Sequence, residues 1–547
     1  MPFFVVFILG AVILGAGAML SPAWRTVQPR IGLAATLCLA LVVGGAVFWA
    51  ELFGWDTLVI DYLLFFLVSV VVLGGTLSQA QMRAEAKGEE LPDSIQGWPG
   101  PRDLAVFGLL GLALVMALAW FELPWGPSGP ISALLTLTAR EGRTFHDLSP
   151  FYPNIQVYTA PGFHALTAYL SQQLRQPIPM IQLSVGALAV LLSAWTAYDW
   201  GAEWRDKRLG RAFALLAAGF GLALFIMGEL AALLGLAFAY ACAVYALRAL
   251  RHGWLGDVMG AGLLLGATVY ADFTVALFTV LGYSAWAAYR LLIAPRALKD
   301  LGEGAHSLAR RRWVALGVPL VALAGLAPYL AANLARLLDV VPRLVDPSAL
   351  SAHYAARAAL IGLAIPVTAW LGLIVLRAWE GLPQGLRAAL RGPVFSLGAG
   401  LLALTLGSLT LWGFGDPLGS NARDVLAWAA RHLPKESRLL VTAHAPDAAW
   451  AMGLSERAAL PLPQATFLGT SAAPPAVVGQ DALPLLISDP NPQAWGEDQA
   501  DALRLLGITH VYLPFNDSDS SGMDVRYFEL AHSNGWASLW RVRSKAP

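Results

Sequence analysis

The chain has 547 residues, of which 57% are hydrophobic and 13% are charged, and its formal net charge is zero. Soluble globular proteins are about one quarter charged, so this composition, with a mean hydropathy of +0.59, is typical of a protein that membrane lipids solvate. The neutral charge balance argues against nucleic acid as a partner, and the two cysteines, Cys38 and Cys242, lie in apolar runs that predict neither a disulfide framework nor a metal site.

Apolar runs of about 20 residues are long enough to cross the hydrocarbon layer as helices. Two long runs are split at Gly228-Glu229 and at Ala271-Asp272, where an acidic residue interrupts the apolar pattern. The sequence therefore predicts an all-α polytopic membrane bundle of about 12 transmembrane helices. The predicted spans are 2–20, 31–50, 57–78, 103–121, 179–198, 209–227, 229–247, 256–271, 273–293, 313–333, 357–377 and 394–412.

Lysine and arginine collect in alternate connections, and such basic loops face the cytoplasm. Clusters lie near residues 25–30, 83–102, 205–211, 248–251, 296–312 and 377–391, whereas the intervening connections are poor in basic residues. One exception is the 334–356 loop, where two arginines are balanced by two aspartates. This pattern predicts a multi-pass protein of the cytoplasmic (inner) membrane whose N-terminus, long loop 122–178 and C-terminal domain are extracytoplasmic.

Composition shifts divide the chain into four parts. Residues 79–102 mix charges with proline and glycine, which is typical of a connector and not of a buried helix. The predicted parts are a three-helix membrane extension (1–78), this cytoplasmic linker (79–102), a transmembrane module with the long outer loop (103–412), and a soluble domain (413–547). The N-terminal helices and the C-terminal domain are the surfaces expected to bind protein partners.

The loop 122–178 is long for a membrane protein, and long loops are commonly functional. Small, polar and leucine positions over 131–140 predict a helix lying on the membrane surface. A second helix is predicted to open at Pro161, because proline suits the first helical turn. Aromatic side chains such as Tyr152 and Tyr158 match the amphipathic belt at a membrane surface.

After residue 420 the pattern changes to short alternating elements, which predict a small α/β domain with a partly parallel sheet. We expect a helix over 422–432 capped at Ser420-Asn421, a strand over 438–443, a helix over 498–506, and strands over 508–513 and 537–542. This part contains no phosphate-binding glycine loop and no metal-ligand spacing. The acidic run 516–522 lacks the register of a calcium loop and is interpreted as a solvated loop.

Three segments resemble the GT-C superfamily, the polytopic glycosyltransferases that use lipid-phosphate-linked sugars. They are Ala139-Arg-Glu-Gly-Arg143 with Tyr152-Pro153, Pro161-Gly-Phe-His164 leading into the next helix, and Ala422-Arg-Asp-Val-Leu-Ala-Trp428 followed by Arg438-Leu-Leu-Val441. With the span 103–121 rising into a long outer loop, they cover roughly residues 103–547. The resemblance implies a polyprenyl-phosphate-sugar donor and an acidic residue that activates the acceptor or holds a divalent metal, Mg or Mn.

Members of this superfamily typically carry that acid, often with a histidine, at the start of the first outer loop. The matching stretch here, residues 123–131, has neither, so the acid is displaced or catalysis is lost. Glu122 is the nearest carboxylate, although its position also suits a helix-end charge. Asp147 beside His146 is the next candidate pair, and its alternative is a turn cap with a solvated ring.

Glu229 and Asp272 interrupt long apolar runs, and an acid at membrane depth is costly enough to suggest function. The predicted topology, however, puts both at outer hairpin tips, where water would reach them. His164, at a helix start, is placed either to face a phosphate or to pack against the loop. The 334–356 region and its border carry the cations that could clamp a lipid phosphate or simply anchor the chain at the interface: Arg336, Arg343, His353 and Arg357.

The resemblance implies a membrane glycosyltransferase (hexosyltransferase) that moves a sugar from a polyprenyl-phosphate donor to a glycan, lipid or protein acceptor of the cell envelope. Glu122, Asp147, Glu229 and Asp272 are its candidate catalytic acids. His146, His164, Tyr152 and Tyr158 are candidate substrate contacts, together with the four cations. The alternatives are a non-catalytic accessory subunit of a larger complex and a transporter, and the absence of a clear inverted repeat argues against the transporter.

Overall fold

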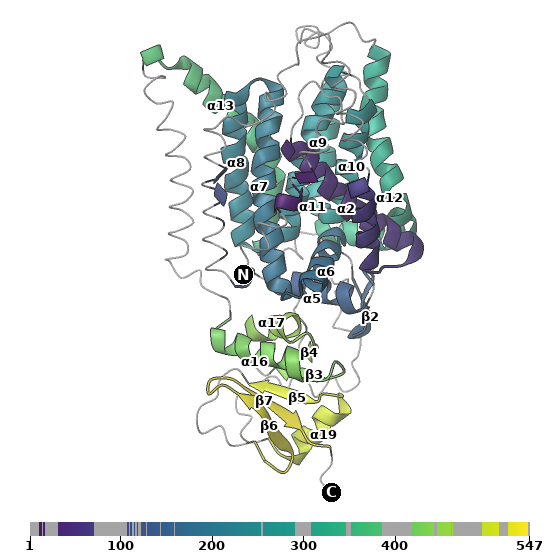
Figure 1. Cartoon of the computed structure of the whole chain (residues 1–547), viewed down its shortest axis with the longest axis vertical. Helices are drawn as coiled ribbons and strands as arrows, with labels where there is room; N and C mark the ends of the chain where they lie inside the picture. The colour runs from purple at the N-terminus through teal and green to yellow at the C-terminus, as the bar shows by residue number, and fades with distance from the viewer. Residues whose placement is uncertain are drawn as a thin grey trace. The chain divides into compact units, whose positions relative to one another are not determined.

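The structure is a computed structural model. It describes residues 31–69, 122–126, 128–142, 144–157, 159–252, 255–289, 308–345, 352–385, 418–441, 446–460, 495–513 and 523–544, together with residue 462 and isolated positions before 122. Contacts between residues divide the chain into two compact units. Unit 1 comprises residues 1–121, 160–169 and 183–414, and unit 2 comprises 122–159, 170–182 and 415–547 (Figure 1).

Unit 1 is a helical bundle built from apolar segments. Six of the described helices are long and apolar enough to cross a membrane, and the segments Leu58–Ser69, α10 and α11 are shorter apolar helices. The predicted count of 12 spans is not confirmed, because the predicted spans 2–20, 103–121 and 394–412 lie largely or wholly outside the described residues. The labelled helices that belong wholly or mainly to unit 1 are α2 (Ile31–Phe53), α6 (Gly162–Leu174), α7 (Ile178–Trp204), α8 (Lys207–Ile226), α9 (Leu230–His252), α10 (Leu255–Ala271), α11 (Phe273–Ala288), α12 (Leu308–Val345) and α13 (Ala352–Gly381).

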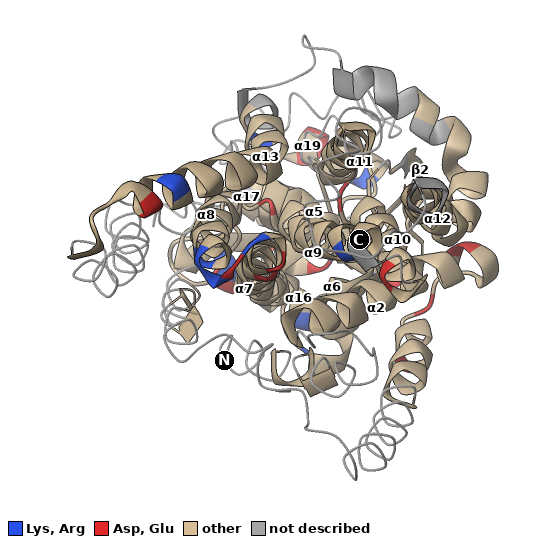
Figure 2. Cartoon of the chain, turned by 90° about the horizontal axis from the view of Figure 1, so that it is seen from above, with Lys and Arg blue, Asp and Glu red and all other residues tan. Residues whose placement is uncertain are grey.

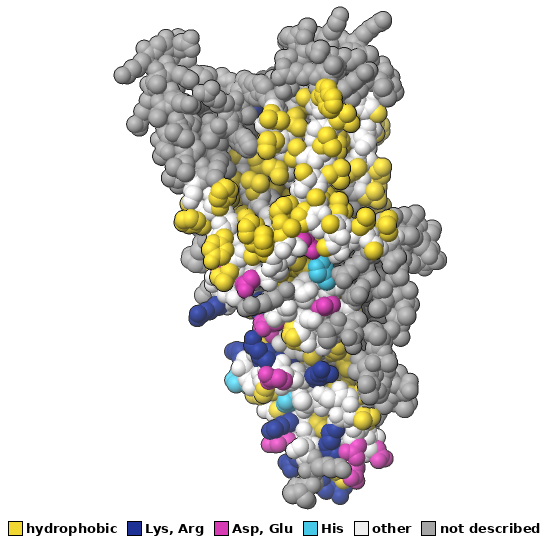
Figure 3. Space-filling model, turned by 90° about the vertical axis from the view of Figure 1, so that its right-hand side faces the viewer, with side chains coloured by type: hydrophobic (Ala, Val, Ile, Leu, Met, Phe, Trp, Pro, Cys, Tyr) yellow, Lys and Arg dark blue, Asp and Glu magenta, His cyan; other side chains and the backbone are white. Residues whose placement is uncertain are grey.

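The surface of unit 1 carries the apolar side chains that a lipid solvent requires. Large hydrophobic residues on α12 and α13 are exposed, among them Trp313, Leu320 and Trp370. Figure 3 shows hydrophobic side chains gathered over the helices of this unit. A water-soluble protein rarely exposes so continuous an apolar surface, so the bundle is a membrane protein.

Helix α2 lies inside the bundle, where it packs against α9, α10 and α12. Most of its residues are buried, from Ile31 through Ala50. Glycine permits the closest approach of α6: a Cβ on Gly162 would lie 2.6 Å from Val43 of α2 and 2.7 Å from the carbonyl oxygen of Tyr270 on α10. The start of α6 therefore packs directly on α2 and on the end of α10.

The two ends of the bundle differ in their ionic contacts. At one end, Arg205 after α7 donates to Glu380 of α13 at 2.8 Å, and both side chains are partly exposed. The connection between α7 and α8 is blue and red in Figure 2, whereas the helices themselves are mostly tan. At the other end lie the second turn of α13 and the α8–α9 and α10–α11 turns, which share the ion pairs described below. The splits predicted at Gly228-Glu229 and at Asp272 are therefore confirmed as helix ends.

Unit 2 combines part of the loop 122–178 with the chain after residue 415. Its five-stranded sheet has the order β4-β3-β5-β7-β6, in which β3 pairs in parallel with β4 and β5, and β7 pairs antiparallel with β5 and β6. This confirms the predicted partly parallel sheet. The elements are α5 (Ser128–Gly142), β1 (Asp147–Leu148), β2 (Tyr152–Gln156), α16 (Ser420–His432), β3 (Arg438–Val441), α17 (Pro446–Ser455), β4 (Ala458–Leu460), α19 (Glu497–Leu505), β5 (His510–Leu513), β6 (Phe528–Ser533) and β7 (Ser538–Val542).

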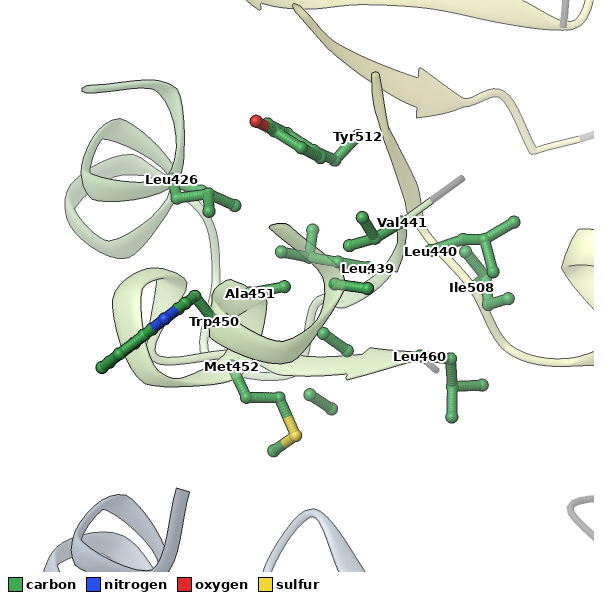
Figure 4. Packing of buried hydrophobic residues seen from close by; sticks show 14 of the residues in the cluster. Leu426, Leu439, Leu440, Val441, Trp450, Ala451, Met452, Leu460, Ile508 and Tyr512 are labelled. Carbon is green, nitrogen blue, oxygen red and sulfur yellow. The ribbon is translucent and has the colours of Figure 1, made fainter. Parts of the chain in front are cut away.

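One hydrophobic core serves both parts of unit 2. Leu134 and Leu137 of α5 belong to the same buried cluster as Leu440 of β3, Trp450 of α17 and Tyr512 of β5. Figure 4 shows the side chains that α16, α17 and the strands contribute to this core. The prediction that 131–140 lies on a membrane surface is wrong: α5 is buried because it packs against α17, and a Cβ on Gly453 of α17 would lie 2.7 Å from Ala133.

Two further expectations differ in detail. The helix predicted to be capped at Ser420-Asn421 instead has Gly419 as its N-cap, without a side-chain cap. Helix α12 continues to Val345, through the whole first half of the expected loop 334–356. Leucine, alanine and arginine all favour helix there, so the charges near its end lie on helical turns. Because α5 and the sheet share a core, this part of the loop and the C-terminal part form one unit.

Candidate functional site

Three helix ends in unit 1 bring together two acids and one base. Glu229 lies in the turn between α8 and α9, and Asp272 is the residue that separates α10 from α11. Arg357 lies in the second turn of α13. The side chains of Glu229, Asp272 and Arg357 are 5%, 8% and 17% exposed, so the group is nearly closed to solvent. We call these three residues the ionic cluster.

The Arg357 guanidinium makes the contacts that hold the cluster together. Its Nε donates to Glu229 Oε2 at 2.6 Å, and its Nη1 donates to Thr274 Oγ1 at 2.9 Å. Its Nη2 donates to Asp272 Oδ2. A planar guanidinium with five donors suits this arrangement, whereas a lysine ammonium presents one point charge.

Asp272 has a second task, because it is the N-cap of α11. Its Oδ1 accepts hydrogen bonds from the backbone N–H groups of Thr274 at 2.9 Å and Val275 at 3.0 Å. Both carboxylate oxygens are therefore engaged, one by the helix and the other by Arg357. Such a carboxylate is held in place from two sides, which suits it to a positioning role.

The expectation that Glu229 and Asp272 would be wet hairpin tips is wrong. Both residues do lie at helix ends, but their relative exposures are only 4% and 6%. A buried carboxylate requires a charged or hydrogen-bonding partner, and Arg357 supplies it. Thr274 was not predicted, although an aspartate two residues before a threonine at a helix start is a capping signal that the sequence carries.

The arrangement of donors does not fit a divalent metal. Magnesium and manganese prefer several oxygen ligands, and two carboxylates alone supply few of them. In the described part of the chain, no three His, Cys, Asp or Glu side chains converge on one point. The Arg357 cation also occupies the position between the two carboxylates where a metal would lie, so Mg or Mn would have to displace it.

The other two candidate acids lie in unit 2 and form local contacts. Glu122 is exposed and pairs with Arg423 of α16. Asp147 Oδ1 accepts from the backbone N–H of Ser149 at 2.9 Å, which is the geometry of a turn cap. The backbone N–H of its neighbour His146 donates to Thr144 Oγ1 at 3.1 Å, and its carbonyl accepts from Val157. The Asp147 contact matches the turn cap that was its alternative.

His164 and Tyr152 are buried and support packing. His164 is 4% exposed in the first turn of α6, where burial lowers the pKa of its imidazole to about 3 and keeps it neutral. The Tyr152 hydroxyl donates to the carbonyl oxygen of Ala459 at 3.0 Å, which ties β2 to β4. Tyr158 lies outside the described residues.

Of the four candidate cations, the structure brings Arg357 to the acids. Arg336 and Arg343 lie on α12 and His353 lies on α13, and their side chains are outside the described residues. The pattern of the sequence could not distinguish these four, because which one meets Glu229 and Asp272 depends on how three distant helices pack.

An apolar groove of about 660 Å³ lies among α10, α11 and α12. Small residues such as Ala287, Ala315 and Ala322 leave the space, and leucine and valine side chains line most of the remainder. Tyr283 is among its few polar residues, and its hydroxyl donates to the carbonyl oxygen of Ala315 at 2.9 Å. Val269, in the lining, precedes Asp272 by three residues, a rise of about 4.5 Å along a helix.

No protein-family model matches the chain, and no curated protein matches it. Among solved structures, it is similar to the oligosaccharyltransferase AglB from Archaeoglobus fulgidus in complex with an inhibitory peptide and a dolichol-phosphate, with 14% identity and a TM-score of 0.44 over 75% of this chain and 69% of that one. The apo oligosaccharyltransferase of the same organism gives 12% and 0.44 over 75% and 69%. Its complex with Zn and sulfate gives 12% and 0.40 over 77% and 71%.

Oligosaccharyltransferases of this kind are members of the GT-C superfamily, which is the superfamily that the sequence resembles. At these identities and TM-scores the likeness assigns neither an activity nor a substrate to this chain. Any function therefore has to be argued from its own residues.

Proposed function

We propose that this chain is a membrane glycosyltransferase of GT-C type, which transfers a sugar from a polyprenyl-phosphate donor to an acceptor of the cell envelope at the outer face of the membrane. The observation that carries the proposal is the ionic cluster. Ionisable groups at the buried ends of membrane helices are costly, and they commonly mark substrate sites. The sequence segments that resemble the superfamily support the same assignment.

In this proposal each member of the cluster has a distinct role. Arg357 binds the donor phosphate, because a guanidinium pairs with phosphate oxygens as it does with carboxylates. Glu229 takes the proton of the acceptor hydroxyl once the phosphate competes for Arg357. Asp272, fixed by its helix cap, holds the guanidinium in position.

The reaction balances with these groups. The acceptor O–H bond breaks as its proton passes to the Glu229 carboxylate, and the acceptor oxygen forms a bond to the anomeric carbon of the sugar. The bond from that carbon to the phosphate oxygen breaks, and polyprenyl phosphate leaves with the bonding electrons. Arg357 stabilises the charge that develops on the leaving phosphate.

The apolar groove suits the tail of such a donor. Its lining is almost entirely hydrocarbon, and it begins about one helical turn from Asp272. A prenyl chain in the groove would place its phosphate near the ionic cluster. Burial of each methylene contributes about 0.8 kcal/mol, so even partial insertion of a long chain would anchor the donor.

The alternative is a non-catalytic membrane subunit, and two observations favour it. Residues 123–131 lack the acid and the histidine expected there, and Arg357 already neutralises one of the two acids of the cluster. In that case the cluster would serve only to join α8, α10 and α13, and its loss would affect stability without affecting any transfer reaction.

Transfer of a labelled sugar by the purified full chain in nanodiscs distinguishes these two functions. We expect the Glu229→Gln variant to lose transfer while it still binds the donor, because the amide keeps the size and removes the base. Glu380→Gln changes an exposed partner of Arg205 at the opposite end of the bundle and is the matched control. Equal transfer by Glu229→Gln and Glu380→Gln, or absence of transfer by the unmodified chain with polyprenyl-phosphate-linked hexoses, would favour the accessory role.

A further inference from the structure

Unit 2 carries a group of stacked rings outside the ionic cluster. The imidazole of His532 on β6 stacks on the indole of Trp428 on α16, with ring centroids 4.5 Å apart and planes 3° apart. His432, one helical turn after Trp428, stacks on the same indole at 4.6 Å and 17°. Two titratable rings from different elements thus share one aromatic partner. We call these three residues the ring stack.

The stack joins α16 to the sheet, and a hydrogen bond joins the same two elements. Asn534, just after β6, donates from its side chain to the carbonyl oxygen of Asn421 at 2.8 Å, near the start of α16. The stack lies further along the same helix. Together they tie α16 to β6, and the Val425 and Ala429 side chains on the inner face of α16 are buried in the core.

The ring stack is stable with one protonated histidine but not with two. The His432 Nδ1–H donates to the carbonyl oxygen of Trp428 at 3.0 Å, which holds this ring against its own helix. A single imidazolium over an indole face is stabilised by a cation–π interaction. A second imidazolium on the same indole would be repelled by the charge of the first, and this repulsion would exceed the cation–π stabilisation.

The surrounding charges oppose the second proton further. Burial lowers the pKa of His532, and the charge of His432 lowers it again. Arg457 donates to the carbonyl oxygens of Ala430 at 3.0 Å and Leu433 at 2.5 Å, so a fixed cation lies at the C-terminal end of α16. On β7, the residue opposite His532 is Leu539, which carries no charge.

We propose that the ring stack is an acid-sensitive latch, which holds α16 against β6 when its histidines are neutral and releases it when both are protonated. The contribution of His532 has a definite sign. Because its pKa in the folded chain is below its ordinary value of about 6.5, the neutral stack stabilises the fold fully above that pH and less as the pH falls below it. The latch is a feature of unit 2 and is independent of the proposed transfer reaction.

Thiol labelling of the full chain in nanodiscs tests the latch. Both native cysteines are buried, so Val425→Cys reports exposure beneath α16. An aromatic disulfide reagent that reacts in acid is used from pH 8 to pH 5, and Glu436→Cys, at an exposed position, corrects for the pH dependence of the reagent. The corrected rate is expected to rise several-fold towards pH 5, and to stay constant when His432→Gln and His532→Gln are added.

Ala429→Cys provides a second probe of the same surface, in case the first substitution disturbs the core. A corrected rate that does not change with pH at either probe would overturn the proposal. A rise that persists without the two histidines would overturn it as well, because acid would then open unit 2 by another route. Labelling of Cys242 must stay absent throughout, which shows that unit 1 remains folded.

Discussion

Replacing Arg357 by methionine tests how strongly the ionic cluster holds the bundle. The substitution keeps much of the aliphatic length and removes the charge, which leaves the buried Glu229 and Asp272 carboxylates facing one another. Breaking a buried ion pair by removal of one partner costs about 3–5 kcal/mol, because the remaining charge is uncompensated. With two carboxylates left, we expect a loss at the upper end of that range.

The matched control is Arg205→Met, which removes an arginine from the partly exposed pair with Glu380. Exposed pairs contribute about 0–1 kcal/mol. The free energy of unfolding is measured by titrating the full chain from mild detergent into SDS and following circular dichroism. The expected difference between the two variants is about 3 kcal/mol or more.

A second genetic background separates the effect of the lost charge from the effect of lost packing. When Glu229→Gln and Asp272→Asn are already present, Arg357→Met no longer leaves a buried charge, and its cost should fall to about 1–2 kcal/mol, the value of lost hydrogen bonds. If Arg357→Met costs no more than Arg205→Met, or costs the same in both backgrounds, the account of the cluster as a buried ionic junction is refuted.

Three further predictions concern other parts of the chain. Burial lowers the pKa of His164 to about 3, so the neutral ring stabilises the fold fully above pH 6.5. The free energy of unfolding should fall below that pH, by about 2 kcal/mol at pH 5. The His164→Gln variant should lack this pH dependence of the free energy of unfolding. Arg457→Met removes the donors to two carbonyl oxygens at the end of α16 and should lower the stability of unit 2 by about 1–3 kcal/mol in a thermal melt, whereas an unchanged midpoint would exclude that role. The fragment 413–547 lacks α5 and should aggregate when expressed alone, and a dispersed spectrum of a monomeric fragment would contradict the shared core.

The sequence predicted helix ends well wherever an acid interrupts an apolar run. The breaks at Gly228-Glu229 and at Asp272 are visible because a charge inside a membrane helix is expensive, so the chain turns there. The short parallel strands β3 and β5 were also recognisable as buried apolar runs. By contrast, α17 was missed, because a short helix that is apolar around most of its surface has no periodic signal.

What the sequence could not predict depends on partners that are distant along the chain. Helix α5 has the composition of a surface helix, and it is buried because α17, about 300 residues later, packs against it together with β1. Likewise, Arg357 is one of four candidate cations, and only packing among α8, α10 and α13 selects it. Local patterns describe elements, whereas the site is a property of their assembly.

Binding of a polyprenyl monophosphate to the full chain tests the central claim most directly, because it requires neither the sugar nor the acceptor to be known. Native mass spectrometry of the chain and of its Arg357→Lys variant would compare this lipid with phosphatidic acid, which has a similar headgroup and a different tail. We expect the unmodified chain to prefer the polyprenyl lipid, and the variant, which keeps the charge but loses the planar fork, to bind it on the order of tenfold more weakly. Equal binding by both proteins, or no preference between the two lipids, would contradict the assignment of the ionic cluster as a donor site.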